Sequence, residues 1–447
     1  MDRVTLLLDG NTFEGRSLLN TLQQVGYEVF TLAVEDDGFL PEGITSVYGM
    51  YLGDFSQDGS LPQKPRYFNQ IDRPDYWEIS GTGQGGRVSD GGRERGRIFY
   101  AEPQHKRLVR QVHWLDEAGN VRASDHYNKY GALFARTVCN AKGARVTKTY
   151  YDVAGQEKIV ENFVTGNIIL NDEGKTYIYK NKTEFIAGYL KKKGLDEGRI
   201  FYNSLSTPFF VTLALEKKGE GDVLFWQEGE REDIPGNMQA ILDGGVPRTR
   251  LIVAQNRRAF YKLRELSGDN DMLTGLGYIY PFKRSNQHRR EAMICTNSDQ
   301  VEQLKTLVEA LPELHFNVLA ITEMSSKLMA FDDYENVSLY PGVKTKKAEE
   351  LFGKCDIYLD INHANEILDA VREAFLNDQI IYAFDELAHN RDFTARKNIY
   401  KIADTEKLIT AIRQILSDGE MWETCLRQQK IDAMAETKQS FTLKYKI

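Results

Sequence analysis

The sequence predicts an α/β fold made of two Rossmann-like domains, with an extended antiparallel β-meander inserted in the first. Three observations predict it: a strand–helix–strand unit at the start, evenly spaced turn glycines in the middle, and alternating strands and helices beyond them. The 447 residues allow about two to four compact units. We place the first domain at 1–60 and 182–285, the insert at 61–181 and the second domain at 286–447.

The first predicted element is a short buried strand, residues 4–8, which ends at a turn that begins with Asp9. Apolar residues then recur at helical spacing, and Gly26 stops this helix before a second strand at 29–32. A strand, a helix and a strand within about 30 residues form a βαβ unit, the start of a Rossmann-like sheet.

The inserted segment has a different pattern. Glycines that suit hairpin turns recur every twelve residues, at positions 119, 131, 143 and 155. The stretches between them are rich in Val, Thr, Tyr and Phe, which favour strands. Even spacing with a turn signal each time predicts a long antiparallel meander.

Beyond the insert, strands and helices alternate again. Strands are predicted at 200–202, 223–225, 251–253 and 278–280, and in the second domain at 292–295, 316–320, 337–340, 357–359 and 380–383. Helices are predicted near 299–310, 345–353, 365–376, 404–417 and 419–437, with the basic stretch 283–290 as a linker. This rhythm predicts a second parallel sheet with helices on both faces, whose ligands bind beyond the carboxyl ends of the strands.

The charge balance excludes some partners. With 57 Lys and Arg against 65 Asp and Glu, the net charge of −8 argues against attraction of the whole protein to nucleic acid or anionic lipid. Residues 61–180 alone carry 19 basic and 14 acidic side chains. We interpret this basic sheet as a surface for an acidic protein or for solvent, because no RNA-binding signature accompanies it.

The cysteines and the apolar runs indicate a compartment. Four isolated cysteines, at 139, 295, 355 and 425, predict neither a disulfide framework nor a zinc site. No apolar run reaches the roughly 18 residues of a spanning helix, and the run at 4–8 is too short for a signal peptide. We expect a cytoplasmic protein, and a peripheral position at the cytoplasmic face of the cell membrane stays open.

Several motifs have a simpler explanation than a functional site. Residues 81–86 match G-x-G-x-x-G, but no helix follows them, so we interpret them as a hairpin loop. Asp269 and Asp271 form a D-x-D pair, but two carboxylates are too few for a closed metal site. Asp125 and His126 are neighbours in a strand, where adjacent side chains point to opposite faces.

A better candidate for acid–base chemistry follows the strand at 380–383. Asp385, Glu386 and His389 lie together in sequence at its carboxyl end. A solvated loop explains them better than a catalytic group does.

Two Rossmann-like domains that face a cleft suit a GT-B glycosyltransferase, with the sugar donor on the second domain and the acceptor on the first. Retaining GT-B enzymes carry an E-x7-E motif, and Glu373 resembles its second glutamate. Asn365 stands where the first glutamate belongs. Glu366 is one residue away, which on a helix is a rotation of about 100°.

A second departure from the active enzymes agrees with the missing first glutamate. Active members hold the departing diphosphate with an Arg and a Lys after the first strand of the second domain. Here the stretch 296–303 has two carboxylates and no cation. Such a loss costs about two to three orders of magnitude in rate per group. The sequence therefore predicts no catalytic residue, no metal and no cofactor, with Glu373 as a remnant of a degenerate donor site.

The meander within a GT-B frame, together with the segments 36–43, 65–70, 75–79 and 96–100, carries a resemblance. Over its whole length the chain resembles the GtfB family, the stabilising subunits of peptide O-GlcNAc transferases in streptococci and related Gram-positive bacteria. The resemblance implies a catalytic partner, GtfA, that transfers GlcNAc from UDP-GlcNAc to Ser and Thr of a serine-rich repeat adhesin. The modified adhesin would then leave by the accessory Sec system.

The resemblance also implies that the stabilising subunit binds the acceptor polypeptide and holds GtfA in an active form. We expect the acceptor in the cleft, at Asp9, Asn11, His363, Asn365 and Glu366. We expect GtfA on the meander, because open sheet edges can dock a related sheet, and we leave open a homodimer when the chain is alone. Two alternatives remain: an active retaining enzyme of the wall-teichoic-acid type that uses a UDP-sugar, and a scaffold with no peptide site.

Overall fold

The computed structural model describes residues 2–215, 221–268 and 270–444. The chain is an α/β protein, and the strands within these ranges form three sheets. It divides into two compact units. The N-terminal unit comprises 1–227, 233–253 and 266–274, and the C-terminal unit comprises 228–232, 254–265 and 275–447.

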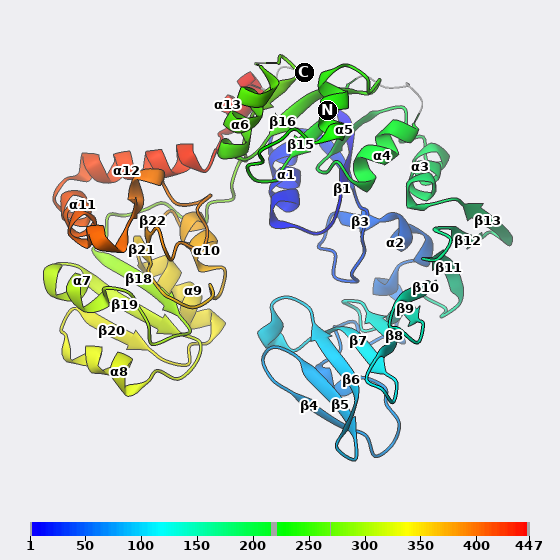
Figure 1. Ribbon diagram of the computed structural model, residues 1–447, viewed down its shortest axis with the longest axis horizontal. Helices are drawn as coiled ribbons and strands as arrows, with labels where there is room; N and C mark the ends of the chain where they lie inside the picture. Colours follow the sequence, from blue (N-terminus) through cyan, green and yellow to red (C-terminus); the bar gives the residue numbers. More distant parts are fainter. Residues whose placement is uncertain (1, 216–220, 269, 445–447) are drawn as a thin grey trace. The chain divides into compact units, whose positions relative to one another are not determined.

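A seven-stranded sheet forms the Rossmann-like part of the N-terminal unit (Figure 1). Its order is β17 (Leu273–Gly275), β16 (Thr249–Ala254), β15 (Asp222–Trp226), β14 (Arg199–Tyr202), β1 (Arg3–Leu8), β2 (Glu28–Ala33) and β3 (Ile44–Ser46). Strands β15, β14, β1, β2 and β3 are parallel neighbours. All residues of β1 after Arg3 are buried, as expected for a strand covered on both faces.

Helices α1 (Phe13–Gln24), α2 (Val47–Leu52), α3 (Lys182–Lys192), α4 (Thr207–Ala214) and α5 (Gly236–Leu242) belong to the same unit. Helix α1 begins after Thr12, whose hydroxyl accepts a hydrogen bond from the Gly15 N–H at 3.0 Å. The helix ends before Gly26, and β2 begins two residues after this glycine. Gly26 has a φ of 102°, a backbone conformation that favours glycine. The predicted βαβ unit is therefore present with its predicted stop.

A ten-stranded antiparallel sheet is inserted between β3 and β14. It runs in chain order through β4 (Glu78–Gly81), β5 (Gly86–Asp90), β6 (Arg93–Tyr100), β7 (Val109–Leu115), β8 (Val121–Tyr127), β9 (Leu133–Cys139), β10 (Arg145–Tyr151), β11 (Glu157–Asn162), β12 (Ile168–Asp172) and β13 (Lys175–Tyr179). The four glycines at twelve-residue spacing all lie in its turns, with φ between 74° and 88°. Their left-handed backbone explains why glycine recurs there.

The meander joins the Rossmann-like part through packing and charge. The rings of Tyr48 in α2 and Tyr150 in β10 stack with centroids 4.5 Å apart. At the start of α3, the Lys182 ammonium lies 2.5 Å from a Glu35 carboxylate oxygen and 3.5 Å from one of Glu161 in β11. Glu35 lies two residues beyond β2, so this lysine connects the meander to the carboxyl end of that strand.

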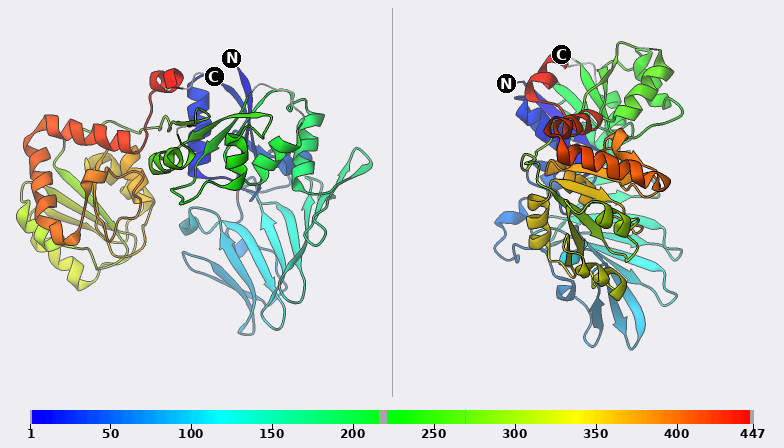
Figure 2. Two further views of the ribbon diagram at one scale, coloured as in Figure 1. Left: turned by 45° about the horizontal axis from the view of Figure 1, so that its top comes forward. Right: turned by 90° about the vertical axis from the view of Figure 1, so that its left-hand side faces the viewer.

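A six-stranded parallel sheet forms the core of the C-terminal unit. Its order is β20 (Val337–Tyr340), β19 (His315–Ala320), β18 (Glu291–Thr296), β21 (Ile357–Asp360), β22 (Ile380–Phe384) and β23 (Ile399–Tyr400). The helices of this unit are α6 (Arg257–Ser267), α7 (Leu304–Ala310), α8 (Ser326–Met329), α9 (Thr345–Lys354), α10 (Ala370–Leu376), α11 (Thr405–Ser417), α12 (Gly419–Asp432) and α13 (Lys438–Lys444). Figures 1 and 2 show helices on both faces of this sheet, as the sequence predicts.

Three local predictions were wrong. The strand expected at 278–280 is reduced to one bridge, between Tyr278 and Ala435. Helix α7 begins at Leu304 rather than near 299, because the preceding loop pairs with a distant segment instead. Helix α10 begins at Ala370 rather than at 365, because Leu368 and Asp369 adopt a left-handed backbone with φ of 57° and 54°.

The stretch 283–290, interpreted from sequence as a linker, is fastened to the C-terminal unit. Arg284 and Arg289 both bind the carboxylate of Asp356, at 2.5 Å and 3.0 Å. The Asp356 side chain is fully buried, and it also accepts the backbone N–H of Gln287 at 3.1 Å. Burial alone would raise the pKa of Asp356, but the hydrogen bonds from both arginines outweigh it and lower the pKa.

Candidate functional site

The carboxyl edge of the seven-stranded sheet carries a polar network at its switch point. The chain builds outward from β1 in one direction and from β14 in the other, so the order reverses between these two strands. Asp9 follows β1, and its N–H donates to the Asn203 side-chain oxygen, which follows β14, at 2.8 Å. The Ser206 hydroxyl donates to the Asp9 carboxylate at 2.7 Å. The Asn203 amide in turn donates to Gln227 at 2.9 Å.

The predicted residues Asp9 and Asn11 therefore lie at a typical ligand edge, although they have separate partners. The exposed Asn11 accepts a hydrogen bond at 2.7 Å from Arg16 in helix α1, which follows directly in the chain. Our sequence reading missed Asn203 and Ser206. For Asn203 the signal was available, because it follows the predicted strand 200–202 directly, as Asp9 follows its own strand; Ser206 lies three residues further on.

The C-terminal unit has its own switch point, between β18 and β21. Here the loop after β18 (297–303) pairs with the loop after β21 (361–369). Val301 and Asn362 form an antiparallel bridge. The Glu302 N–H donates to the Ile361 carbonyl at 2.8 Å, and the His363 N–H donates to the Gln300 carbonyl at 3.0 Å.

A side-chain contact reinforces this pairing. The His363 Nε2 lies 2.6 Å from a carboxylate oxygen of Glu302. This hydrogen bond from the imidazole is the main reason why the pKa of Glu302 is lowered. The predicted acceptor residue His363 is thus held by a contact inside its own unit.

Asn365 and Glu366 lie in the same loop and not on a helix, so the argument from a rotation of about 100° per helical residue does not apply. Asn365 is exposed. A carboxylate oxygen of Glu366 accepts the Val371 N–H at 2.8 Å, in the first turn of α10. Glu366 therefore satisfies one of the free N–H groups at the helix start.

Glu373, the predicted remnant of a donor site, is engaged elsewhere. Its carboxylate binds the Lys283 ammonium at 2.5 Å. Lys283 belongs to the fastened stretch 283–290, and its backbone N–H donates to the Leu376 carbonyl at 2.7 Å. Glu373 thus holds this stretch against the end of α10.

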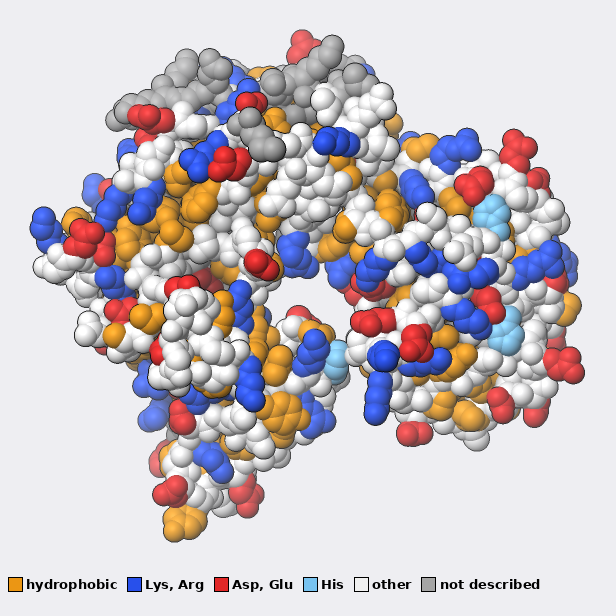
Figure 3. All heavy atoms as spheres, turned by 180° about the vertical axis from the view of Figure 1, so that it is seen from behind, with side chains coloured by type: hydrophobic (Ala, Val, Ile, Leu, Met, Phe, Trp, Pro, Cys, Tyr) orange, Lys and Arg blue, Asp and Glu red, His pale blue; other side chains and the backbone are white. Residues whose placement is uncertain are grey.

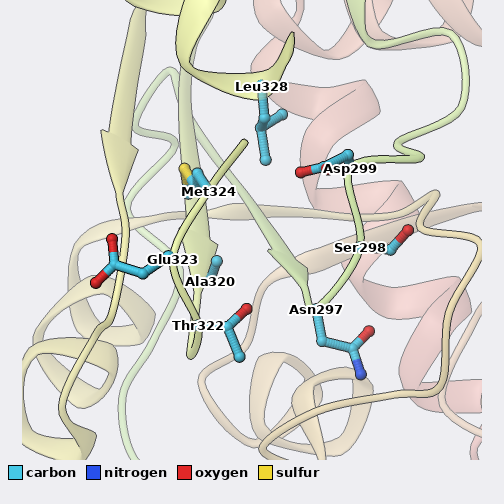
Figure 4. Close-up of a pocket in the computed structure, with 8 residues that line it drawn as sticks. All are labelled: Asn297, Ser298, Asp299, Ala320, Thr322, Glu323, Met324 and Leu328. Atoms are coloured by element: carbon cyan, nitrogen blue, oxygen red, sulfur yellow. The ribbon is translucent and has the colours of Figure 1, made fainter. Parts of the chain in front are cut away.

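A pocket of about 260 Å³ lies beside the switch point, at the carboxyl ends of β18 and β19 (Figure 4). It is lined by Asn297, Ser298, Asp299, Ala320, Thr322, Glu323, Met324 and Leu328. Figure 4 shows the loop that carries Asn297 and Asp299 facing the loop that carries Thr322 and Met324. None of these eight described residues is a Lys or an Arg. The pocket is also smaller than the roughly 300–1,000 Å³ typical of ligand sites.

His389 is the most constrained histidine at this edge. Its Nδ1 lies 2.5 Å from the carboxylate of Asp360, at the end of β21, and its Nε2 lies 2.6 Å from the Ala364 carbonyl. The hydrogen bond to Asp360 raises the pKa of His389 to about 9, so both ring nitrogens donate. His389 therefore fixes the loop after β21 and has no nitrogen left for acid–base work.

The other two members of that cluster point to different partners. Asp385 binds Arg391 at 2.5 Å, and Glu386 accepts the Ile402 N–H at 3.1 Å. The sequence cluster Asp385, Glu386 and His389 does not form one site.

The remaining motifs have structural roles. Asp125 in β8 binds Arg136 at 2.6 Å, whereas the His126 Nε2 lies 2.9 Å from the Thr137 hydroxyl. Burial lowers the pKa of His126 to about 3, so it is neutral. Residues 81 and 86 pair across the hairpin of β4 and β5, which confirms a hairpin loop.

Asp269 lies outside the described residues. Among those that are described, no group of three or more His, Cys, Asp and Glu side chains could hold a metal ion. None of the helices in the described ranges combines the length and the apolar character needed to cross a membrane.

Family models match most of the chain. They are the GtfB N-terminal domain over 6–51, the GtfB middle domain over 77–180, the GtfB third domain over 182–266 and the GftB/GlyA-F C-terminal domain over 292–429. The middle-domain match coincides with the ten-stranded sheet.

Full-length relatives agree with these models. The chain is 40% identical over 438 residues to a UDP-N-acetylglucosamine–peptide N-acetylglucosaminyltransferase stabilizing protein GtfB of Streptococcus agalactiae, covering 98% of this chain and 97% of that protein. It is 41% identical over 426 residues to the protein of the same name from Streptococcus pneumoniae serotype 4, covering 95% and 94%.

Among solved structures, a chain of a GtfA/B complex bound to UDP and GlcNAc superposes with a TM-score of 0.93 at 39% identity, covering 99% of both chains. A chain of the accessory secretory protein 1, 2 and 3 structure from Streptococcus pneumoniae superposes with a TM-score of 0.63 at 12% identity, covering 96% and 95%. The second match shows only a shared fold.

Proposed function

Since the chain belongs to the GtfB family of peptide N-acetylglucosaminyltransferase stabilising proteins, we propose that it is a non-catalytic subunit that acts with a catalytic GtfA subunit. The near-complete match to a chain of a GtfA/B complex supports this partner. The complex would add GlcNAc to Ser and Thr of a serine-rich repeat adhesin in the cytoplasm, before export by the accessory Sec system.

The observation that carries the non-catalytic role is the state of the donor-side edge in the C-terminal unit. A departing nucleoside diphosphate needs cations or N–H donors aimed at it. Here the adjoining pocket has carboxylates from Asp299 and Glu323 and no lining Lys or Arg. Glu373, the one remnant of the E-x7-E motif, is bound to Lys283. A sugar nucleotide would therefore meet negative charge and no cationic side chain among the residues that line this pocket.

We place acceptor binding at the two carboxyl edges, with Asp9 and Asn11 on one unit and His363, Asn365 and Glu366 on the other. The N-terminal edge is the stronger half of this proposal. Its hydroxyl, amide and carboxylate groups suit the hydroxyls and amides of a Ser-rich polypeptide. A repetitive acceptor offers many weak sites, and holding it beside the partner raises its effective concentration at the partner's active centre.

We place the GtfA contact on the ten-stranded sheet. Its two edge strands, β4 and β13, expose large side chains: Tyr76, just before β4, is 98% exposed, and Ile178 in β13 is 68% exposed. Figure 3 shows Lys and Arg side chains beside hydrophobic ones over this sheet. Exposed aromatic anchors, positive charge and open edges are features of a docking surface. The same edges would serve a homodimer when the partner is absent.

The test combines calorimetry with a transfer assay. We expect the purified chain to bind an unmodified Ser-rich repeat polypeptide and to show no heat with UDP-GlcNAc. Added to GtfA, it should raise the rate of GlcNAc transfer to that polypeptide. Asp9→Ala combined with Asn203→Ala should weaken polypeptide binding about tenfold, the equivalent of one to two lost hydrogen bonds.

Glu28→Ala is the matched control for that double variant, since it removes an exposed carboxylate from the same sheet, away from the carboxyl edge. Micromolar binding of UDP-GlcNAc, or GlcNAc transfer by the chain without GtfA, would contradict the proposed function. Either result would favour an active retaining glycosyltransferase.

A further inference from the structure

The nucleotide crevice of a doubly wound sheet lies at its switch point, where the strand order reverses and the loops diverge. In the C-terminal unit this point lies between β18 and β21, and the two loops that flank it are 297–303 and 361–369. These loops do not diverge. They are joined by the Val301–Asn362 bridge, which consists of two backbone hydrogen bonds, and by the side-chain contact between His363 and Glu302.

The second loop is also fixed from its far side. His389 binds the carboxylate of Asp360 and the carbonyl of Ala364, and the Ala364 N–H donates to Asn362 at 2.8 Å. The Asn362 residue is 3% exposed. The bridge is therefore anchored to β21 through a chain of direct hydrogen bonds and is not a contact between two loose loops.

Both loops leave the bridge through unfavourable backbone conformations. Gln303, at the start of α7, has a φ of 53°, and Leu368 and Asp369, at the start of α10, have φ of 57° and 54°. A left-handed backbone is unfavourable for a residue that carries a side chain, and it persists only where the surroundings impose it. These conformations fall where each loop enters its helix, so each loop is constrained at its helix end as well as at the bridge.

We propose that loops 297–303 and 361–369 form a latch that keeps the nucleotide crevice of this unit closed. This inference rests on the proposed non-catalytic role and extends it. The missing cations would only weaken the binding of a sugar nucleotide, whereas the latch excludes the ligand from the position between the loops. The stabilising subunit therefore does not compete with its catalytic partner for the shared donor.

Hydrogen–deuterium exchange of the full chain tests the latch directly. We expect the Glu302 and His363 amides to be protected in the unmodified chain. Glu302→Ala should speed exchange in peptides covering both loops about tenfold, because the side-chain contact to His363 is lost. Glu302→Gln keeps the size of the side chain and should show a smaller effect in the same peptides.

Glu350→Ala is the matched control, since it removes a surface ion pair to Lys347 on α9, at 3.3 Å, and should leave both loops unchanged. A thermal unfolding curve identifies any variant that is misfolded, in which case Glu302→Gln alone decides the outcome. The latch is refuted if the unmodified chain exchanges these amides at unprotected rates. It is also refuted if millimolar UDP slows exchange in either loop.

These outcomes separate the two proposals. An open latch in a chain that still activates GtfA would remove only the latch. Transfer of GlcNAc by the chain alone would remove the non-catalytic role, whatever the exchange rates show.

Discussion

At the scale of single residues, His389 gives the clearest pH dependence. Its pKa of about 9 lies above the usual value near 6.5, because the protonated ring binds the Asp360 carboxylate. A histidine whose pKa is raised by folding stabilises the protein fully below pH 6.5, and this contribution is lost as the pH rises through 9. We therefore expect His389→Gln to lower the free energy of unfolding by about 1–2 kcal/mol at pH 6.5, as for a partly screened charged hydrogen bond.

The same substitution should cost much less at pH 9.5. Urea unfolding of both chains at the two pH values measures this difference. His105→Gln, in an exposed turn of the meander, serves as the control and should show no such change. An equal loss of stability at both pH values would mean that the His389 ring is neutral in the folded chain.

The position of a residue could be predicted from sequence where a strand end is marked locally, whereas its role in acceptor binding stays a prediction. Asp9 could be placed at a ligand edge because it follows an obvious apolar run. The roles of Glu366 and Glu373 could not be predicted, since each depends on a partner that no local pattern identifies. Glu366 caps the helix that follows it, and Glu373 binds Lys283, 90 residues away in sequence.

At the scale of elements, a buried ion pair joins the starts of two strands in the seven-stranded sheet. Arg248 binds Asp222 at 2.7 Å and 3.1 Å and also donates to the Asp196 carbonyl at 2.8 Å. The Arg248 and Asp222 side chains are 2% and 1% exposed. Removing one partner leaves the other charge buried and unpaired.

Asp222→Ala should therefore lower the free energy of unfolding by about 3–5 kcal/mol. Glu28→Ala is the comparison, because its pair with Arg3 at 3.0 Å is 59% and 72% exposed. It should cost less than about 1 kcal/mol. Urea unfolding measures both, and similar losses would show that solvent screens the buried pair as it does the surface pair.

Element boundaries were predictable only where the signal is local. Gly26 and the turn glycines of the meander end their elements because of their own backbone freedom. The start of α7 was missed because Val301 pairs with Asn362, 61 positions away in sequence, instead of joining the helix. The start of α10 was missed because Leu368 and Asp369 adopt a left-handed backbone that interrupts the helix. Tyr278 was misassigned for a related reason, since its one bridge partner, Ala435, lies in a distant segment.

At the scale of the whole molecule, the predicted fold class is confirmed: parallel sheets in two Rossmann-like parts, with an antiparallel meander inserted in the first. Alternation of strands and helices and the spacing of turn glycines were sufficient for this. The closed switch point of the C-terminal unit could not be predicted, because it is a product of two loops brought together by the finished sheet. The sequence nevertheless predicted a non-catalytic donor side independently of this loop pairing, because residues 296–303 contain no Lys or Arg.

The two ion pairs that Arg284 and Arg289 form with Asp356 determine where the C-terminal unit can be cut. A fragment that begins at 291, the first residue of β18, would keep Asp356 but lose Arg284 and Arg289, leaving a buried carboxylate without its partners. We expect a fragment 283–447 to be more stable than 291–447 by about 3 kcal/mol or more, with urea midpoints as the measurement. Equal midpoints would show that water replaces the arginines. The segment that looks in sequence like a dispensable joint is thus part of this unit, and any transplantation of the unit into another protein has to carry it along.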